Sequence, residues 1–524
     1  MNEDSAKSTT TRRSFIKATA VVGAGVSLPN WAMQAASAQS NFRPRPGAHD
    51  SMIEVPFEEH GGEVRVGIVG VGHRGYGMIE EFLNVPGVRI TAIADTFGPR
   101  AHSAAARVVA AGHPTPAVYT GGAPSYDVDA HAAYEAAVEA SRRARVVEPD
   151  RNANDYTGLC ARDDVDIVYT AAPWEWHHPV AMAAMHAGKH VAVECPMAMT
   201  MDHLWELVDT CEATRRHCVQ LENNTYDDDV MRVMNMAHAG LFGELLSGAC
   251  GYLHDLRYEM FIRSNRDSTF RGTPYRRLWN TRLDACYYPT HGIGLMAMYM
   301  DINRGDRFTT LTAKASYPPR GIAEYREMFV PQDSPVWDEE YIKGDRTMCL
   351  LETARGRVVR LDHSTSTSYP GNTEINHLQG TRGRYEDEEV HRVDPDIFID
   401  PDEPERENDW GNWDDYAEYD HWLVKKFDGE GGSHGGSDYR AVWQLVQAMR
   451  LGLAPAIDVY DSATWSAPVP LSAESLSKGG REVRFPDFTR GNWENYHKGL
   501  DSPNPEEESD QPATAGDTVT SHAG

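Results

Sequence analysis

A short polar and aromatic segment, Tyr287-Tyr288-Pro289-Thr290-His291, carries side chains that can move protons. A phenol or an imidazole acts as a general acid or base once its pKa is shifted toward the working pH. The segment has neither helical nor strand periodicity, and a buried, hydrogen-bonded tyrosine is the default interpretation of either tyrosine alone. We therefore ask which elements would position Tyr288 and His291 where such chemistry could use them.

Three other polar segments each follow a short apolar run. They are Pro173-Trp174-Glu175-Trp176-His177-His178 after residues 166–171, Glu194-Cys195-Pro196 after residues 190–193, and Glu222-Asn223-Asn224 after residues 219–221. Ligands of open α/β sheets bind beyond the carboxyl ends of parallel strands. A Trp-x-Trp pair more often packs in a core, but its place at a strand end beside two histidines favours a site. All three segments are therefore expected to face one cofactor.

The element that would hold this cofactor lies between residues 64 and 95. An apolar strand at 64–69 runs into Gly70-Val71-Gly72-His73-Arg74-Gly75, and a helix then leads to a strand at 88–94 that ends at Asp95. Glycines allow a tight turn and the close approach of backbone N–H groups to a pyrophosphate, which the helix N-terminus also attracts. Asp95 can accept hydrogen bonds from the ribose hydroxyls, which favours NAD over NADP. The spacing of strands, helix and acid predicts a Rossmann domain.

The chain of 524 residues is too long for one ordinary core, and its texture changes after about residue 240. Extended segments at 245–254, 309–316, 348–352 and 358–361 indicate a mostly antiparallel sheet, and residues 437–451 a helix. We expect an α/β protein, with an N-terminal Rossmann dinucleotide-binding domain and a C-terminal α+β domain with an open, mostly antiparallel sheet. The predicted boundaries are 39–62 for a linker, 63–240 for the NAD-binding domain, 241–498 for the substrate domain and 499–524 for a disordered acidic tail. Within them we expect an insertion at about 122–155 in the NAD-binding domain and an acidic surface loop at 383–415 in the substrate domain.

The N-terminus, residues 1–38, has the pattern of a twin-arginine signal peptide. Arg12 and Arg13 precede a modest apolar run at 18–28, and Ala36-Ser37-Ala38 provides a small-x-small cleavage site. The apolar run is too short and too rich in glycine to span ~30 Å of hydrocarbon. We expect export by the twin-arginine machinery to the periplasm or the outside of the cell, without stable membrane insertion. Because this route carries folded proteins, a cofactor can be loaded before export.

Composition excludes several classes of partner. The net charge of −28, from 78 acidic and 50 basic residues, would repel nucleic acid and anionic membranes. The seven cysteines are scattered and lack zinc-ligand spacing, so we expect neither a disulfide framework nor a metal. The composition leaves a homo-oligomer open.

Longer stretches give the chain a family resemblance. It is similar to the Gfo/Idh/MocA oxidoreductases, and within them it most resembles the NAD-dependent glycosidases of glycoside hydrolase family 109, whose founding activity is α-N-acetylgalactosaminidase. The resemblance covers roughly residues 64 to 493, through AAPWEWHHP, AVECP, HCVQLENNTYD, GLFGEL, GYLHDLR, YYPTHGIG, INRGDR, GGSHGGSDY, DVYDSATWSAPVPLSAES and FPDFTRGNW.

The resemblance implies roles for particular residues. Those implied to contact NAD are Gly70, Gly72, His73, Arg74, Gly75, Asp95, Trp174, Glu175, Trp176, His177, Glu194, Cys195, Asn223 and Tyr288. Those implied to contact a carbohydrate substrate are Tyr252, Arg276, Tyr288, Pro289, Thr290, His291 and Tyr369.

The implied reaction uses NAD in every turnover and regenerates it. Hydride leaves C3 of an N-acetylgalactosaminide-type or related glycoside, a base removes the C2 proton, and the C1 oxygen is expelled. Water then adds and the hydride returns to C3, so NAD can stay tightly bound. Which residue is the C2 base stays open at this point.

Two departures separate the chain from the dehydrogenases of the superfamily. Cys195 stands where these enzymes have the lysine of Glu-Lys-Pro, and Tyr287, four before His291, stands where they usually have aspartate. Both argue against the alternative of an NAD-dependent sugar or polyol dehydrogenase. A non-catalytic sugar-binding protein that retains NAD is a second alternative. Cys195 lacks a paired base and is not expected to be a nucleophile, so proton transfer would fall to Tyr288 and His291.

Overall fold

The computed structural model describes residues 50–120, 155–263, 274–369, 372–386, 412–427, 432–495 and 499–501. The predicted signal peptide lies outside these residues, as do nearly all of the predicted insertion and of the C-terminal tail, and most of the acidic segment 383–415. Within the described part of the chain, no helix is both long enough and apolar enough to cross a membrane.

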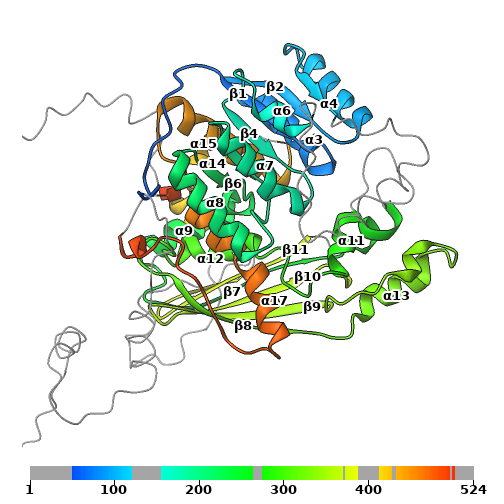
Figure 1. Cartoon of the computed structure of the whole chain (residues 1–524). Helices are drawn as coiled ribbons and strands as arrows, with labels where there is room; N and C mark the ends of the chain where they lie inside the picture. Colours follow the sequence, from blue (N-terminus) through cyan, green and yellow to red (C-terminus); the bar gives the residue numbers. More distant parts are fainter. Residues whose placement is uncertain are drawn as a thin grey trace, which may run out of the picture. The chain divides into compact units, whose positions relative to one another are not determined.

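The N-terminal half is built on a parallel sheet of six strands in the order β3-β2-β1-β4-β5-β6. The strands are β1 (Val64–Val69), β2 (Val88–Ala94), β3 (Ala117–Tyr119), β4 (Ile167–Thr170), β5 (His190–Val193) and β6 (Cys218–Gln220). Helices α3 (His73–Asn84), α4 (Gly98–Ala110), α6 (Tyr156–Cys160), α7 (Trp174–His186), α8 (Met201–Thr214) and α9 (Asp228–His238) alternate with them along the chain (Figure 1). This strand order is that of a Rossmann domain, with ligand sites at the carboxyl ends of the strands.

The C-terminal half is built on a second sheet, in the order β12-β11-β7-β10-β9-β8-β13. Its strands are β7 (Leu245–His254), β8 (Phe308–Ala315), β9 (Arg346–Thr353), β10 (Val358–Ser364), β11 (Asn372–Gly380), β12 (Arg384–Glu386) and β13 (Val483–Arg484). Among the described strand pairs of this second sheet, only the pairing of β10 with β7 is parallel. The predicted fold class, a Rossmann domain followed by an α+β domain with a mostly antiparallel sheet, is confirmed.

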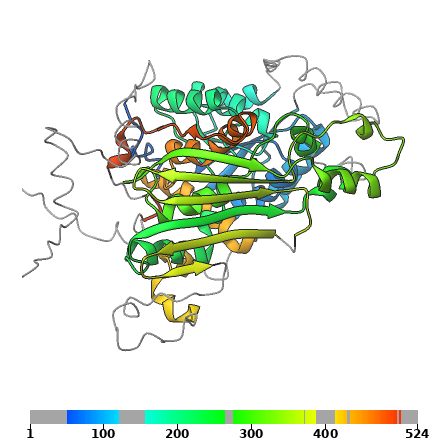
Figure 2. The same ribbon diagram turned by 90° about the horizontal axis from the view of Figure 1, so that it is seen from below.

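Some of the remaining helices pack on the second sheet, and others return to the Rossmann domain. They are α11 (Pro274–Asn280), α12 (Thr290–Tyr299), α13 (Arg320–Phe329), α14 (Trp422–Lys426), α15 (Ser437–Leu451), α16 (Val459–Ser466) and α17 (Pro468–Ser477), with the short turns η1 (Asn224–Tyr226), η2 (Glu259–Arg263), η3 (Pro335–Asp338), η4 (Trp413–Tyr419), η5 (His434–Gly436), η6 (Asn492–Glu494) and η7 (Gly499–Asp501). Helix α15 packs on α3 and β1, and α16 packs on α8 and β6. Helices α12 and α17 pack on one face of the second sheet. Figure 2 looks onto its other face. Along β9, the exposed Met348 and Leu350 alternate with buried residues.

Helix α12 shows why the segment around His291 has no visible period. From Gly292 to Tyr299 every residue of this helix is buried, since it lies between β7, η1, α9 and α16. A helix that is apolar on all sides has no amphipathic stripe to reveal it in the sequence. The tight packing also explains Gly292, where a Cβ would lie 2.9 Å from the backbone nitrogen of Gly251.

Two local expectations differ from the structure. The described end of the predicted linker is packed rather than loose, because Phe57 is buried with its ring 4.3 Å from that of His217 and 4.9 Å from that of His190. The acidic segment starts with a strand instead of a loop, since β12 pairs with the edge of β11 and Tyr385 is buried there.

Candidate active site

The glycine-rich turn between β1 and α3 has the shape that a dinucleotide needs. Gly70 has φ +84°, and a Cβ there would lie 2.6 Å from the backbone nitrogen of Ala172. A Cβ on Gly75 would lie 1.9 Å from the carbonyl oxygen of Gly70. Gly72 is the N-cap of α3 and places no side chain over the helix N-terminus. The turn thus fits a pyrophosphate, which binds bare backbone N–H groups at such a terminus.

Asp95 closes the same turn from the end of β2. Its Oδ2 accepts a hydrogen bond from the backbone of Val71 at 2.9 Å, and its Oδ1 accepts one from the backbone of Phe97 at 2.8 Å. The guanidinium of Arg100 lies 3.8 Å from Oδ2. The carboxylate therefore lies directly beside the glycine-rich turn, as a ribose-binding acid must.

Arg74 is held by two carboxylates. Its Nε donates to Oε1 of Glu194 at 2.8 Å, while Nη1 and Nη2 donate to the two oxygens of Asp438 at 2.8 and 2.7 Å. Nδ1 of His434 lies 2.7 Å from the same Asp438 carboxylate. Burial opposes ionisation of Asp438, but Arg74 outweighs it and lowers the pKa of this carboxyl. Arg74 thus ties the glycine-rich turn to the Glu-Cys-Pro turn and to α15, whereas His73 is exposed.

The Glu194-Cys195-Pro196 turn is fixed by its two polar side chains. Oε1 of Glu194 accepts a hydrogen bond from the hydroxyl of Tyr169 at 2.7 Å, in addition to the one from Arg74. The thiol of Cys195 donates to Oε2 of Glu222 at 3.0 Å. Burial, and then the charge of Glu222, raise the pKa of Cys195 well above its ordinary value. Cys195 is therefore a neutral hydrogen-bond donor, which agrees with the expectation that it is no nucleophile.

His177 connects two of the loops that follow strands. Its Nδ1 lies 2.8 Å from the carbonyl oxygen of Pro196, and its Nε2 lies 2.8 Å from that of Ala172. The ring is buried, and burial lowers the pKa of His177. His177 therefore holds the loop before α7 against the Glu-Cys-Pro turn.

The central pair of the site joins the two domains. Nδ1 of His291, in the first turn of α12, lies 2.7 Å from Oε1 of Glu222, which follows β6. Glu222 is fully buried and also accepts the backbone N–H of Asn224 at 3.1 Å. Burial opposes the charged imidazole, but the attraction of Glu222 and its hydrogen bond outweigh it and raise the pKa of His291 to about 9. The pair at neutral pH is thus an imidazolium with a carboxylate.

Aromatic rings form one wall beside this pair. The ring of Tyr252 stacks on Tyr288 at 4.7 Å and on His291 at 5.1 Å, and Trp174 meets Tyr288 edge-on at 5.2 Å. Burial raises the pKa of Tyr252 and that of Tyr288 above their ordinary values. Trp174 from the Rossmann domain and both tyrosines from the second domain therefore come together as predicted, and both phenols keep their protons.

Arg276 of α11 orients one of these phenols. Its Nε donates to the hydroxyl oxygen of Tyr288 at 2.8 Å, and its Nη1 donates to Oε2 of Glu259 at 2.8 Å. The guanidinium thereby fixes the direction of the Tyr288 hydroxyl, and Glu259 fixes the guanidinium. The sequence placed Arg276 and Tyr288 in one site, and the structure brings them into contact.

A second histidine and carboxylate also lie beside Tyr252. The ring of His254, at the end of β7, stacks on Tyr252 at 3.6 Å. Its Nε2 lies 3.7 Å from Oε1 of Glu374 on β11, whose other carboxylate oxygen accepts a hydrogen bond from the amide of Asn224. Burial lowers the pKa of His254 although Glu374 opposes the shift. The site thus holds one charged and one neutral imidazole, both stacked on the ring of Tyr252.

Other predicted residues occupy less central positions. Oε2 of Glu175 accepts a hydrogen bond from the indole of Trp279 at 3.0 Å, so it lies near the aromatic wall. The ring of Trp176 lies 6.2 Å from that of Tyr156 on α6, which makes it part of the Rossmann packing. The Trp-x-Trp pair is therefore divided between the site and the core.

Of the remaining predicted site residues, three lie beside the central pair and one does not. Asn223 and Thr290 are buried beside the central pair, since one is adjacent to Glu222 and the other to His291, and Pro289 is the N-cap of α12. Tyr369 is half-buried in the segment after β10, and it does not join the hydrogen-bonded cluster formed by the described residues.

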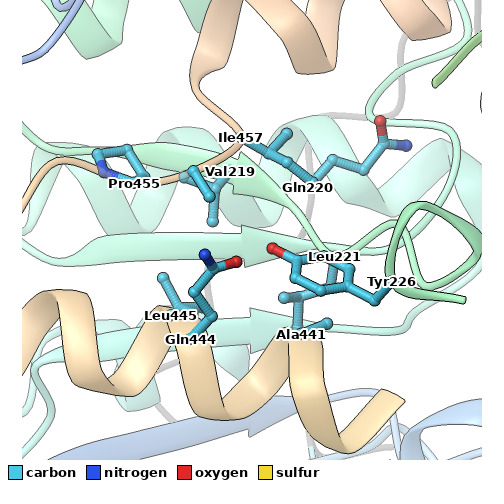
Figure 3. A pocket seen from close by; sticks show the side chains of 10 residues that line it. Val219, Gln220, Leu221, Tyr226, Ala441, Gln444, Leu445, Pro455 and Ile457 are labelled. Atoms are coloured by element: carbon cyan, nitrogen blue, oxygen red, sulfur yellow. The ribbon is translucent and has the colours of Figure 1, made fainter. Parts of the chain in front are cut away.

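A cavity of about 20 Å³ lies away from this cluster, between β6 and α15. Figure 3 shows Gln444 of α15 and Gln220 of β6 among the side chains around it. The volume is enough for one water and too small for a nucleotide or a sugar. It is therefore a packing void of the interior.

Sequence reasoning did not assign four of the residues that build the site. They are Glu222, His254, Glu374 and Asp438. Glu222 did have a signal, because it opens a polar segment at a strand end. Glu374 and Asp438 come from β11 and α15, and nothing in their local sequence predicts their partners.

Comparison with known protein families covers nearly the whole chain. The family described as Oxidoreductase family, NAD-binding Rossmann fold, matches residues 64–222, and Glycosyl hydrolase 109, C-terminal domain, matches residues 226–495. A glycosyl hydrolase family 109 protein of Saccharopolyspora erythraea is 46% identical over 495 residues, covering 94% of this chain and 97% of that protein. An α-N-acetylgalactosaminidase of Shewanella oneidensis is 36% identical over 499 residues, covering 92% and 97%.

Solved structures of dehydrogenases share the fold. Levoglucosan dehydrogenase in complex with NADH superposes with a TM-score of 0.55 at 16% identity, covering 81% of this chain and 100% of that one. The myo-inositol dehydrogenase of Lactobacillus casei, in complex with NAD(H) and myo-inositol, has a TM-score of 0.50 at 15% identity, covering 82% and 99%. Identities this low establish the fold alone. From the family matches and the curated relatives, the chain belongs to glycoside hydrolase family 109 and is an NAD-dependent glycoside hydrolase with an oxidoreductase fold.

Proposed function

We propose that the protein cleaves N-acetylgalactosaminides or related glycosides by transient oxidation at C3, deprotonation at C2, elimination at C1, water addition and re-reduction. The substrate class is supported by the Shewanella oneidensis relative, which is an α-N-acetylgalactosaminidase. The observation that carries the mechanism is the pair of unlike histidines, one charged and one neutral, whose rings both stack on Tyr252. A reaction that removes one proton and stabilises the resulting enolate needs both a base and a fixed positive charge.

NAD, when bound, accepts the hydride from C3 and returns it at the end of the turnover. Gly70, Gly72 and Gly75 would hold its pyrophosphate, and Asp95 its adenosine ribose. Trp174, Glu194 and Asn223 lie at neighbouring strand ends and would face the nicotinamide half. Tight retention of the cofactor is part of the proposal, since the hydride is conserved within each turnover.

His291 would stabilise negative charge on the oxidised sugar. Its ion pair with Glu222 keeps the imidazole protonated at neutral pH, so it donates a proton or a hydrogen bond more readily than it accepts one. A buried cation aimed at a C3 carbonyl acidifies the neighbouring C2 proton and stabilises the enolate. Tyr288, oriented by Arg276, would donate a second hydrogen bond to the same oxygen.

His254 would be the C2 base. Its ring is buried and its lowered pKa leaves it neutral, with Nε2 only 3.7 Å from the Glu374 carboxylate. That carboxylate can stabilise the imidazolium that forms when the ring takes a proton. Tyr252 and Tyr288 are poorer candidates, because burial raises the pKa of each phenol. Tyr252, Thr290 and Tyr369 are retained as proposed sugar contacts.

The protein would be exported in its folded state. The twin-arginine signal at residues 1–38 would direct the folded protein, with NAD already bound, to the periplasm or the extracellular space. A recycled cofactor suits such a compartment, where free NAD is scarce. A fusion of residues 1–38 to a reporter that needs folded export tests this step, and replacing Arg12 and Arg13 by lysines should abolish the export.

A screen of α- and β-aryl glycosides, with and without added NAD⁺, tests the proposed activity. Cleavage of an N-acetylgalactosaminide with exchange of the C2 hydrogen into deuterated water is the expected result. Stoichiometric NADH accumulation with a free sugar, without cleavage, would instead favour a sugar or polyol dehydrogenase. The solved structures that share the fold of this chain are enzymes of that kind. Binding of ligand and NAD with no C2 exchange would favour a sugar-binding protein.

A further inference from the structure

Two histidines and a glutamate meet between the neighbouring helices α7 and α8. None of the three belongs to the central pair. His178 comes from α7, and His203 and Glu206 lie one turn apart on α8, on the same face of that helix. One potential ligand atom from each residue lies within 4.8 Å of the other two.

The contacts within this trio do not form an ordinary hydrogen-bonded cluster. Nε2 of His178 lies 2.8 Å from Oε2 of Glu206, yet among the described residues this buried nitrogen has no partner in hydrogen-bond geometry. The rings of His178 and His203 stack in parallel, with centroids 3.9 Å apart and an interplanar angle of 7°. Two imidazoles and a carboxylate thus meet with one nitrogen unsatisfied, which has a cost in a buried position.

Both imidazoles can offer a ring-nitrogen lone pair to a metal ion in their neutral form. The side chain of Glu206 is 48% exposed, which gives an ion access from solvent.

We propose that His178, His203 and Glu206 bind a divalent cation of the zinc class. Two imidazoles and one carboxylate are a ligand set that Zn²⁺, Ni²⁺ and Cu²⁺ accept, with water completing the shell on the open side. Parallel rings direct their lone pairs along parallel lines, so one imidazole turns when the ion binds. The exposed Glu206 follows it without disturbing the core.

A metal ion at this position would link the loops that precede α7 and α8. Helix α7 begins at Trp174 of the aromatic wall, and α8 begins directly after the Glu-Cys-Pro turn, with Thr200 as its N-cap. An ion held by both helices cross-links the two loops that His177 already connects. The bound metal therefore stabilises the cofactor side of the Rossmann domain without taking part in the reaction.

The test uses the NAD-loaded chain, purified without a polyhistidine tag and stripped with a chelator. Calorimetric titration with Zn²⁺ should show one saturable site, and the unfolding temperature should rise with Zn²⁺ concentration. His203→Ala and Glu206→Gln should each raise the dissociation constant by about 10-fold or more. His186→Ala removes an exposed histidine from the last turn of the same helix α7 and should change nothing.

A competing location is the buried trio Cys195, Glu222 and His291, whose ligand atoms also lie within 4.8 Å of one another. Substituting Co²⁺ separates the two, because a thiolate ligand gives an intense near-ultraviolet charge-transfer band that a site of two histidines and a glutamate lacks. The proposal is overturned if that band appears and Cys195→Ala abolishes binding. It is equally overturned if the untagged protein binds no metal, or if Glu206→Gln and His203→Ala bind as tightly as the unchanged protein. Folding of each variant is checked by its NAD content.

Discussion

The imidazole of His291 lies 2.7 Å from the carboxylate of Glu222, although 69 positions separate the two residues in the sequence. The histidine comes from α12 of the second domain, and the glutamate follows β6 of the Rossmann sheet. The carboxylate that charges the histidine is thus supplied by the other domain, so the pair exists only when the two domains are packed together.

Glu222→Gln should leave NAD bound but lower kcat/KM by about 10²-fold, in the range typical of acid–base residues. Without this carboxylate the main effect that opposes burial is removed, only the charges of Glu374 and Glu194 still oppose it, and the pKa of His291 falls. The measurement is a pH profile of kcat/KM, in which the alkaline limit near 9 should disappear. Glu352→Gln, at an exposed position of β9, is the matched control. An unchanged alkaline limit in Glu222→Gln would show that the pair does not set it.

His254→Gln should separate the two halves of the proposed reaction. Oxidation at C3 does not require a C2 base, so substrate should still reduce the bound NAD, as seen by absorbance at the NADH maximum. Exchange of the C2 hydrogen with deuterated water should fall by about 10²-fold or more. His102→Gln, on the exposed side of α4, controls for loss of a histidine. Normal C2 exchange in His254→Gln would remove His254 as the base.

Cys195→Ala should lower activity by less than about tenfold, because it removes one hydrogen bond to Glu222 and leaves the ion pair intact. His291→Ala should lower it by about 10²-fold or more, since it removes the cation itself. Steady-state rates and NAD content of both variants provide the comparison. A Cys195→Ala variant that is inactive while folded and loaded with NAD would contradict this account of the Glu-Cys-Pro turn.

Stability should fall as pH rises from 6.5 through 9. The folded-state pKa of His291 is raised to about 9 from an ordinary value of 6.5, so its protonation stabilises the fold fully below pH 6.5 and the contribution is lost as pH passes 9. The shift corresponds to at most about 3 kcal/mol of the free energy of unfolding. Denaturant titrations across this window measure the slope, and His291→Gln should flatten it. An equal slope in that variant would assign the pH dependence to other groups.

Gly75→Ala should abolish retention of NAD, because the new Cβ would lie 1.9 Å from the carbonyl oxygen of Gly70 and force the turn open. Gly77→Ala is a close control, two residues along the same helix, where a Cβ meets nothing within 4 Å. It should keep its NAD and gain helix stability, by up to about 1 kcal/mol. NAD released on denaturation of each purified variant is the measurement. Equal NAD content in the two variants would contradict the assigned binding turn.

The sequence by itself determined the Rossmann unit and the list of strand-end segments around it. Glycine spacing, buried strand runs and Asp95 are local signals, because each reports the conformation or burial of its own segment. The same reasoning singled out Trp174 through its place after a strand, whereas the roles of Tyr288 and His291 came from the family resemblance of their segment.

Only the tertiary structure decided which of these groups act together. It separated Trp174 from Trp176, since one ring joins the aromatic wall and the other packs on α6. It also gave His291 its charge through Glu222, which follows β6, and left His254 neutral through burial, against the opposing effect of Glu374 on β11. A pKa depends on burial and on charges a few ångströms away, whatever their separation along the chain. The identity of a proton-carrying residue was therefore readable from the sequence, whereas its protonation state was a property of the fold.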